Sequence, residues 1–315
     1  MRHLLTLADL TAAEIERIFS IAEDLQKKSE QGLREPLLAG RVMALLFEKP
    51  SLRTRVSFEA GMAHLGGSSI FLSDDAGFGH RESVPDFARV LGQYADVIVI
   101  RAYRHQTALD LATHSGCAVI NGLTDFGHPC QALADLYTVR QLAGKFAGNT
   151  LAWIGDANNV ARSVAVGCGK LGLRLVMATP KKYQFSLESL AWIKQQAPKL
   201  DLSITTDPVE AVRDAVAVYT DVWASMGQEE EAAERRKIFM PFQVNQKLFS
   251  KAAKHAVFMH CLPAHRGDEV TAAVIDSPRS VVFDQAENRL HIQKAIMVLL
   301  LEGGVHRFPP RSAHA

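Results

Sequence analysis

The residues Ser51-Leu-Arg-Thr-Arg55 have the types and spacing of an anion-binding site. An apolar run over 42–47, typical of a buried strand, precedes them, and apolar residues at helical spacing follow them to about residue 65. They therefore lie where a strand gives way to a helix, whose free N–H groups and positive dipole end attract anions. Arg53 and Arg55 diverge if they are helical, whereas both could point one way in an extended segment before the helix. The alternative is a Ser51 N-cap followed by solvated arginines.

Further cationic and polar residues stand where strands end and helices begin. Arg101 ends the apolar run 96–101, and ligands of open α/β sheets bind beyond the carboxyl ends of strands; a surface position is the alternative. His128 precedes Pro129 at the start of a helix expected over 129–143, with Gln131 in its first turn; a plain cap is the alternative for His128. The arginines of this set are Arg53, Arg55, Arg101, Arg266 and Arg289. They suit a small phosphate compound whose reaction needs positioning and charge stabilisation.

Other chemistries fit the residues less well. The turn Gly155-Asp-Ala-Asn-Asn159 lacks the G-x-G-x-x-G pattern of dinucleotide sites, and no nucleotide phosphate loop is present. His260, Cys261 and His265 do not have the spacing of a zinc site, so we expect no metal and no cofactor. Cys261 as a nucleophile paired with His260 is disfavoured, since neighbouring strand residues face opposite sides.

Composition narrows the classes of partner. The 315 residues are 48% hydrophobic and 22% charged with a net charge of +1, so we expect neither a nucleic-acid nor a membrane partner. Four scattered cysteines indicate reduced thiols, and with no signal peptide or long apolar run this predicts a cytoplasmic protein.

Alternating short apolar strands and amphipathic helices predict an α/β fold with two doubly wound parallel-sheet domains and a cleft between them. The pattern restarts after 145–149, which gives domains over 1–144 and 145–287. A C-terminal helix over about 288–304 is expected to pack back on the first domain. We also expect a helix over 241–253 and a strand over 280–283. The loop that contains Trp223 and Met226 is either a closing lid or a segment anchored by Trp223.

Taken together, these motifs resemble the aspartate/ornithine carbamoyltransferase family. The motif Ser51-x-Arg-Thr-Arg55 is similar to its carbamoyl-phosphate motif, and Arg101, His128-Pro-Cys-Gln131 and Asn288-Arg289 are similar to its other phosphate and carbonyl contacts. Two segments, Asp221-x-x-x-Ser225-Met226-Gly227 and His260-Cys-Leu-Pro263, resemble the ornithine branch. Many relatives have Thr where this chain has Leu52, whose backbone N–H can still bind phosphate.

The resemblance implies transfer of a carbamoyl group from carbamoyl phosphate to the δ-amine of L-ornithine, giving citrulline and phosphate in arginine biosynthesis. Putrescine or N-acetylornithine is the alternative acceptor, and a non-catalytic homologue is a rival of another class. The family also implies a homotrimer, with loop 73–83 contributing across the interface. The implied carbamoyl-phosphate residues are Ser51, Leu52, Arg53, Thr54, Arg101, His128, Gln131, Cys261, Leu262 and Arg289. The implied ornithine residues are Asn158, Asn159, Asp221, Ser225 and Met226. Catalysis would fall to Cys261, Arg101, His128 and Arg289.

Overall fold

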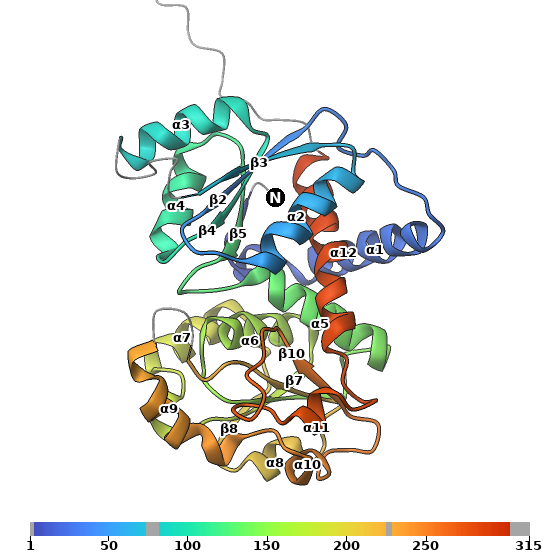
Figure 1. The fold of residues 1–315 in the computed structure, drawn as a ribbon, viewed down its shortest axis with the longest axis vertical. Coiled ribbons are helices and arrows are strands. Elements are labelled where there is room, and N and C mark those ends of the chain that lie inside the picture. Colours follow the sequence, from blue (N-terminus) through green and yellow to red (C-terminus); the bar gives the residue numbers. More distant parts are fainter. Residues whose placement is uncertain (1–2, 74–81, 225–228, 303–315) are drawn as a thin grey trace, which may run out of the picture. The chain divides into compact units, whose positions relative to one another are not determined.

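The computed structural model describes residues 3–73, 82–224 and 229–302 and consists of two compact units (Figure 1). Unit 1 comprises residues 1–130 and 289–315, and unit 2 comprises residues 131–288. The chain passes between the units inside two helices, α5 (Pro129–Ala143) and α12 (Val282–Leu301). The predicted domain limits, at residues 144 and 287, remain a prediction.

Unit 1 is built on a parallel five-stranded sheet in the order β1-β5-β4-β2-β3 (Figure 1). Its strands are β1 (His3–Leu4), β2 (Val42–Phe47), β3 (Ser68–Leu72), β4 (Val97–Arg101) and β5 (Ala118–Leu123). Every residue of β4 is buried, because a central parallel strand is covered on both faces. The core on one side includes Ala44, Leu46, Ile98, Ile100 and Val119.

Four of the five helices given next begin at a side-chain cap, and the helix after Arg104 is the exception. These helices are η1 (Leu7–Asp9), α1 (Ala12–Glu30), α2 (Leu52–His64), α3 (Val84–Tyr94) and α4 (His105–His114). Helix α1 begins with a capping box, in which the Glu14 N–H donates to the Thr11 hydroxyl while the Glu14 carboxylate accepts from the Thr11 N–H. Its apolar stripe, Ile15, Ile18, Phe19, Ala22 and Leu25, is buried as expected for core packing.

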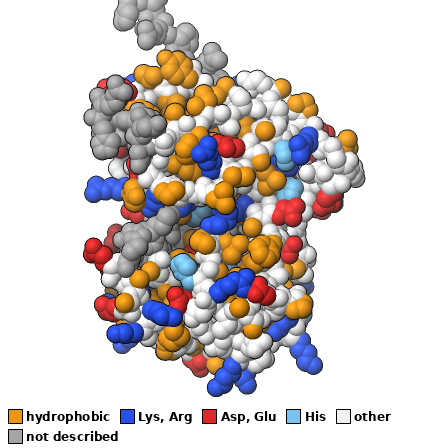
Figure 2. Space-filling model, in the orientation of Figure 1, with side chains coloured by type: hydrophobic (Ala, Val, Ile, Leu, Met, Phe, Trp, Pro, Cys, Tyr) orange, Lys and Arg blue, Asp and Glu red, His pale blue; other side chains and the backbone are white. Residues whose placement is uncertain are grey.

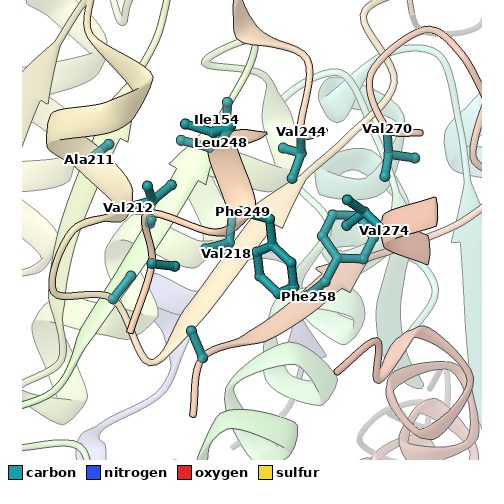
Figure 3. Packing of buried hydrophobic residues seen from close by; sticks show 14 of the residues in the cluster. Ile154, Ala211, Val212, Val218, Val244, Leu248, Phe249, Phe258, Val270 and Val274 are labelled. Carbon is teal, nitrogen blue, oxygen red and sulfur yellow. The ribbon is translucent and has the colours of Figure 1, made fainter. Parts of the chain in front are cut away.

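Unit 2 repeats the architecture with a parallel sheet in the order β10-β9-β6-β7-β8. Its strands are β6 (Thr150–Ile154), β7 (Arg174–Ala178), β8 (Leu202–Thr205), β9 (Ala217–Thr220) and β10 (Val257–His260). Side chains from strands and helices meet in one buried cluster, in which the Phe249 and Phe258 rings pack edge to face with centroids 6.3 Å apart (Figure 3). The prediction of two parallel-sheet α/β domains is confirmed in its fold class.

Helices cover the second sheet as well. They are α6 (Asn159–Leu171), η3 (Lys181–Tyr183), α7 (Leu187–Gln196), α8 (Pro208–Val212), η4 (Glu229–Glu231), α9 (Ala232–Phe239), η5 (Met240–Phe242), α10 (Gln246–Phe249) and α11 (Ala272–Ile275).

Two local predictions are wrong. The expected helix over 241–253 is broken into η5 and the short α10, because the Val244 backbone instead bridges to Val270 and donates to the Glu269 carbonyl. Asn245 then caps α10 anew. The expected strand over 280–283 is reduced to a single bridge at Ser280, and α12 begins at Val282, before the predicted start at 288.

The C-terminal part of α12 packs on unit 1, as predicted. A Cβ placed on Gly61 of α2 would lie 3.2 Å from Lys294 Cγ and 3.4 Å from Met297 Cε. Arg17 of α1 pairs with Glu302 at 2.5 Å.

Two observations bear on the kind of surface the chain presents. Within the described ranges, none of the helices has the length and apolar character needed to cross a membrane. Basic and acidic side chains are interspersed on the face in Figure 2, in keeping with the net charge of +1.

Candidate functional site

In unit 1 the predicted anion residues converge where the strand order reverses. Strand β2 lies between β3 and β4, so the connections after β2 and after β4 leave in opposite directions. Phe47 and Arg101 are paired in register at the carboxyl ends of these strands, and the Glu48 N–H donates to the Arg101 carbonyl at 2.9 Å. Such a switch point is where open α/β sheets bind ligands.

The segment after β2 supplies a helix N-terminus. Ser51 is the N-cap of α2, and its hydroxyl accepts from the Thr54 N–H at 3.2 Å. The helix begins at Leu52, so the possibility of an extended segment in which Arg53 and Arg55 point one way is wrong. The Arg55 guanidinium lies 3.7 Å from the centroid of the Phe71 ring and donates to Glu59 at 3.1 Å. Arg55 is therefore held by Phe71 and Glu59, whereas the charge of Arg53 lies close enough to Arg101 to lower its pKa.

Buried cations gather around this helix start. Arg101 is 6% exposed and Arg289 is 3% exposed, and Arg289 Nη2 donates to the buried Thr54 hydroxyl at 2.8 Å. Burial, and then the nearby Arg289 and Arg53, lowers the pKa of Arg101 to about 10. The buried Nε of Arg101 has no hydrogen-bond partner among the described residues. Cations held this close and this deep are stabilised by a multiply charged anion.

His128 lies in the same cationic surroundings, immediately before α5. It is buried, and its pKa is held well below the usual value, first by burial and then by Arg289 and Arg101. The imidazole is therefore neutral around pH 7, and its protonated nitrogen can donate a hydrogen bond to an oxygen that gains negative charge. Gln131, in the first turn of α5, is also buried.

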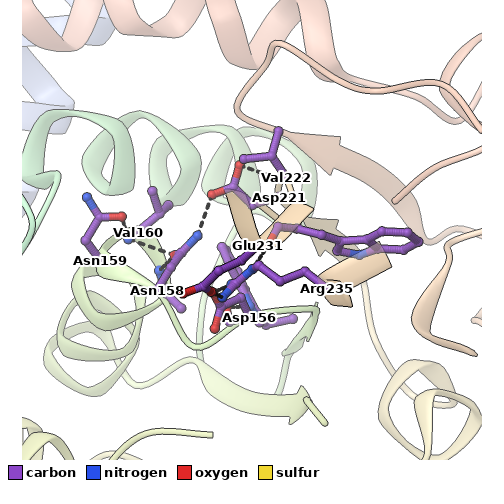
Figure 4. A network of polar contacts seen from close by, with 11 residues as sticks. Asp156, Asn158, Asn159, Val160, Asp221, Val222, Glu231 and Arg235 are labelled. Atoms are coloured by element: carbon purple, nitrogen blue, oxygen red, sulfur yellow. Dashed lines mark hydrogen bonds and ion pairs between the residues drawn. The ribbon is translucent and has the colours of Figure 1, made fainter. Parts of the chain in front are cut away.

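In unit 2 the predicted ornithine residues also stand at a switch point. Strand β6 lies between β7 and β9, and Ile154 and Thr220 are paired at the carboxyl ends of β6 and β9. Asn158 is the N-cap of α6: its Oδ1 accepts from the N–H groups of Val160 and Ala161 at 3.0 Å. Its Nδ2 donates to Asp221 Oδ2 at 2.7 Å (Figure 4). The structure thus joins two residues that are 63 positions apart in sequence.

Cys261 contacts the same carboxylate. Its thiol donates to Asp221 Oδ1 at 3.0 Å, an oxygen that also accepts from the Val222 N–H at 2.8 Å. Burial, and then the Asp221 charge, raises the pKa of Cys261 well above its ordinary value. Cys261 is therefore a protonated hydrogen-bond donor rather than a thiolate nucleophile.

The His260 ring is hydrogen-bonded to a backbone N–H and to a carboxylate rather than to the Cys261 thiol. Its Nδ1 accepts from the Leu262 N–H at 2.8 Å, and its Nε2 contacts Glu269 Oε1 at 3.2 Å. Leu262 has a φ of 60°, and this hydrogen bond holds its unusual backbone conformation. Among the described residues, Asp221, His260 and Cys261 place ligand atoms within 4.8 Å of one another. Both His260 nitrogens already contact other protein groups, the Leu262 N–H and Glu269. That no metal is bound at this site therefore remains a prediction.

One charged residue at this edge has no sequence signal that singles it out. Arg235 of α9 is buried, although it lies in a run of charged residues typical of a solvated helix. It forms an ion pair with Asp156, which follows β6, and donates to the Trp223 carbonyl (Figure 4). The Trp223 ring is 4% exposed and stacks on Phe239 with centroids 6.0 Å apart. The structure therefore favours the anchored segment over a lid for the part of this loop that it describes.

Some predicted residues are not part of the sites described above or cannot be placed. Arg266 is exposed and pairs with Asp276 at 2.8 Å, so it lies outside the cationic cluster. Ser225 and Met226, and positions 74–81 of loop 73–83, lie outside the described residues.

Comparison with known proteins gives matches to both halves of the chain. The carbamoyl-P binding domain of aspartate/ornithine carbamoyltransferase matches residues 2–141, and the Asp/Orn binding domain of the same family matches residues 147–300.

Individual relatives match over nearly the whole chain. An anabolic ornithine carbamoyltransferase of Pyrococcus furiosus is 50% identical over 305 residues, which cover 96% of this chain and 97% of the relative. The ornithine carbamoyltransferase of Bacillus subtilis is 49% identical over 306 residues, covering 96% and 95%. The solved structure of ornithine carbamoyltransferase from Pyrococcus furiosus has a TM-score of 0.93 at 50% identity, covering 96% of this chain and 98% of that one. The structure of the enzyme from Thermus thermophilus has a TM-score of 0.85 at 41% identity, with 95% and 98% covered.

Proposed function

Because this chain belongs to the aspartate/ornithine carbamoyltransferase family, we propose that it transfers the carbamoyl group of carbamoyl phosphate to the δ-amine of L-ornithine. The products are L-citrulline and phosphate, and the direction is that of arginine biosynthesis, as for the relative named anabolic. The observation that carries the proposal is that the chain has both a buried arginine cluster at the start of α2 in unit 1 and the Asn158–Asp221–Cys261 set in unit 2.

The phosphate end of carbamoyl phosphate is bound at the N-terminus of α2. Ser51, the Leu52 N–H, Arg53, Thr54 and Arg101 donate to its oxygens, and the helix dipole adds to their attraction. Burial strengthens these charged contacts, because the surrounding dielectric is lower than that of water. As the bond from the carbamoyl carbon to oxygen breaks, charge builds on the leaving phosphate, and Arg101 and Arg289 stabilise it.

The carbonyl oxygen of the carbamoyl group becomes negative as the amine adds. Arg101, neutral His128 and the Thr54–Arg289 pair donate toward it, which lowers the barrier because the donors are already in place. Gln131 and the backbone carbonyls near Cys261 and Leu262 accept from the carbamoyl amide.

Ornithine is bound by the unit 2 residues. Asp221 pairs with the α-ammonium, and Asn158, Asn159 and the backbone of Ser225 and Met226 bind the α-carboxylate. The δ-amine resembles lysine, with a free pKa of roughly 10.4, so it must be deprotonated before attack. Because Cys261 is a thiol, its proposed role is to orient the amine, from which its sulfur accepts a hydrogen bond.

The bond changes balance without any further reactant. The δ-ammonium first gives one proton to solvent, the neutral amine then forms a bond to the carbamoyl carbon, the carbon–oxygen bond to phosphate breaks, and a second amine proton passes to the departing phosphate. No atom is oxidised or reduced, so the two substrates suffice.

Alternative acceptors are putrescine and N-acetylornithine. Putrescine has no α-carboxylate, so Asn158 would have no ligand group to bind, and N-acetylornithine has no ammonium for Asp221. Citrulline formation with carbamoyl phosphate and each amine tests the choice. Turnover of putrescine or N-acetylornithine without turnover of ornithine would overturn it.

The assembly belongs to the same proposal. We infer a homotrimer in which loop 73–83 contributes to a neighbouring site. Exposed apolar residues of unit 1 support a contact between copies: Leu52 is 75% exposed, Val56 is 51% exposed, and Ile70 on the edge strand β3 is 50% exposed. A mass measurement by light scattering tests it, and a monomeric, fully active protein would contradict it. The four free cysteines support a reducing compartment, the cytoplasm.

One substitution tests the anion site. Arg53→Ala should lower kcat/KM by well over about 2 kcal/mol of transition-state stabilisation, since charged hydrogen bonds at a preorganised site contribute that much. Arg89→Ala is the control, because Arg89 is an exposed residue of α3 that pairs with Asp86 at 3.0 Å. Unchanged turnover in the Arg53 variant would exclude the anion-site interpretation and favour a non-catalytic homologue.

A further inference from the structure

Asp135 is a buried carboxylate at the centre of a hydrogen-bond network that sequence analysis did not identify. It lies on α5, one turn after Gln131, and is 1% exposed. Its Oδ1 accepts from Gln131 Nε2 at 2.8 Å and from Gln285 Nε2 at 2.7 Å, and its Oδ2 accepts from the Tyr219 hydroxyl at 2.9 Å. We propose that Asp135 is a positioning residue that fixes the side-chain amide of Gln131 with its oxygen toward the carbamoyl amide. The proposal rests on the proposed function.

The chemistry of a carboxylate limits which end of the Gln131 amide can face Asp135. A primary amide such as that of Gln131 has a donor end and an acceptor end, and either end can face a given partner. The Asp135 carboxylate is only an acceptor, so it holds the NH₂ end and leaves the Gln131 oxygen for another donor. The carbamoyl group of the substrate ends in an NH₂ that needs such an acceptor. Asp135 therefore selects the one amide orientation that suits this substrate.

A second side-chain amide, that of Gln285, links the Asp135 carboxylate to the backbone of β10. Gln285 donates its Nε2 to Asp135, while its Oε1 accepts from the His260 N–H at 2.9 Å. His260 Nδ1 in turn accepts from the Leu262 N–H. The backbone around Cys261, which is proposed to contact the carbamoyl amide and the attacking amine, is thus linked through Gln285 to the carboxylate that orients Gln131.

The third donor to the Asp135 carboxylate is the Tyr219 hydroxyl. Tyr219 of β9 is fully buried, and burial followed by the Asp135 charge raises its pKa well above the usual value, so it stays a phenol that donates. The charge of Asp135 also contributes, after burial and Asp221, to the raised pKa of the Cys261 thiol. Three donors to one buried carboxylate make a network whose members constrain one another.

Asp135→Asn is the direct test, because it preserves the shape but adds an NH₂ donor. That donor lets the Gln131 amide turn over and present NH₂ to the substrate NH₂. We expect kcat to fall by about 10- to 100-fold, the effect of one or two misdirected hydrogen bonds, with the KM for ornithine nearly unchanged. Tyr219→Phe is the matched control: it removes one donor to the same carboxylate but leaves the bond to Gln131, so its effect on kcat should be smaller.

A cycle of substitutions separates positioning from a general structural role. If Asp135 acts through Gln131, Gln131→Ala costs far less in the Asp135→Asn background than in the wild type. Reversing the polarity gives a rescue. Gln131→Glu alone brings two carboxylates together and should be severely impaired. Adding Asp135→Asn supplies a donor to one of the new carboxylate oxygens and leaves the other to accept from the carbamoyl NH₂, so the double variant should be more active than Gln131→Glu.

The results of these experiments distinguish a failure of the Asp135 inference from a failure of the proposed function. Urea unfolding of each variant identifies those that fail to fold, and the rescue remains decisive because it compares Gln131→Glu with and without the second change. Additive losses, or no recovery in a folded double variant, would overturn the role of Asp135. A wild-type protein that makes no citrulline would instead overturn the proposed function. An active wild type with no coupling between positions 131 and 135 would overturn only this inference.

Discussion

The hydrogen bond between Arg289 and Thr54 allows a quantitative test of the anion site. Both side chains are buried, and their 2.8 Å contact joins the start of α2 to α12 across 235 residues of sequence. Thr54→Val keeps the shape of the side chain but removes the hydroxyl, so the Arg289 guanidinium loses an acceptor that orients it. A hydrogen bond to a charged group contributes about 1.5–3 kcal/mol. At about 1.4 kcal/mol for each tenfold change, kcat/KM for carbamoyl phosphate should fall about 10- to 150-fold.

Thr54→Ser is the matched control for that substitution. It keeps the hydroxyl but removes the methyl, whose carbon lies 3.4 Å from where a Cβ on Gly122 of β5 would stand. The serine variant should retain most of its activity and lose about 1 kcal/mol of unfolding free energy, the value of one buried methyl group. Citrulline formation at varied carbamoyl phosphate and urea unfolding give the two quantities. A folded valine variant with wild-type kcat/KM, or a serine variant impaired more than the valine variant, would refute the reasoning.

Three further predictions concern stability and pH. Asn158→Ala should raise the KM for ornithine and cost about 1 kcal/mol of unfolding free energy, because it removes both the α6 cap and a donor to the ornithine carboxylate; kinetics and urea unfolding check this. Burial, then two neighbouring cations, lowers the pKa of His291 to about 4, so the unfolded state binds more protons between that value and about 6.5, and the unfolding free energy should drop as the pH falls through this window. His291→Gln should make that decline shallower in urea titrations at several pH values, and an identical slope would contradict the assignment. Gly92→Ala should destabilise by at least about 1–3 kcal/mol, because the added Cβ would lie 1.7 Å from the Ser115 carbonyl oxygen, whereas Gln93→Ala on the exposed face of the same helix should be nearly neutral in thermal unfolding.

Local patterns predicted most elements because their causes are local. Helix α5 begins at Pro129 and ends at Ala143 as expected, since proline favours the first turn and Gly144, with a φ of 70°, ends the helix. The central strands are almost wholly apolar because helices cover both faces of a parallel sheet. The helix expected over 241–253 failed for the opposite reason: pairing of Val244 with Val270 is a contact between distant segments, and periodicity carries no information about it.

In the candidate site, too, some features follow from local sequence and others depend on the fold. The residue types of the motif beginning at Ser51, the arginine at the end of β4 and the His128–Gln131 segment were sufficient to indicate an anion site. Where Arg55 points depends on the first residue of α2, because the Arg55 guanidinium lies over the Phe71 ring once the helix begins at Leu52.

The sequence by itself determined the fold class, the strand ends that carry the functional residues and the chemistry of those residues, since each depends on side-chain type and on spacing along the chain. Only the tertiary structure decided their protonation and their partners. His128 is neutral and Cys261 is a thiol because burial and neighbouring charges, which are brought together by folding, shift their pKa values. The network at Asp135 joins residues up to 150 positions apart, and only the folded chain places their donors on one carboxylate.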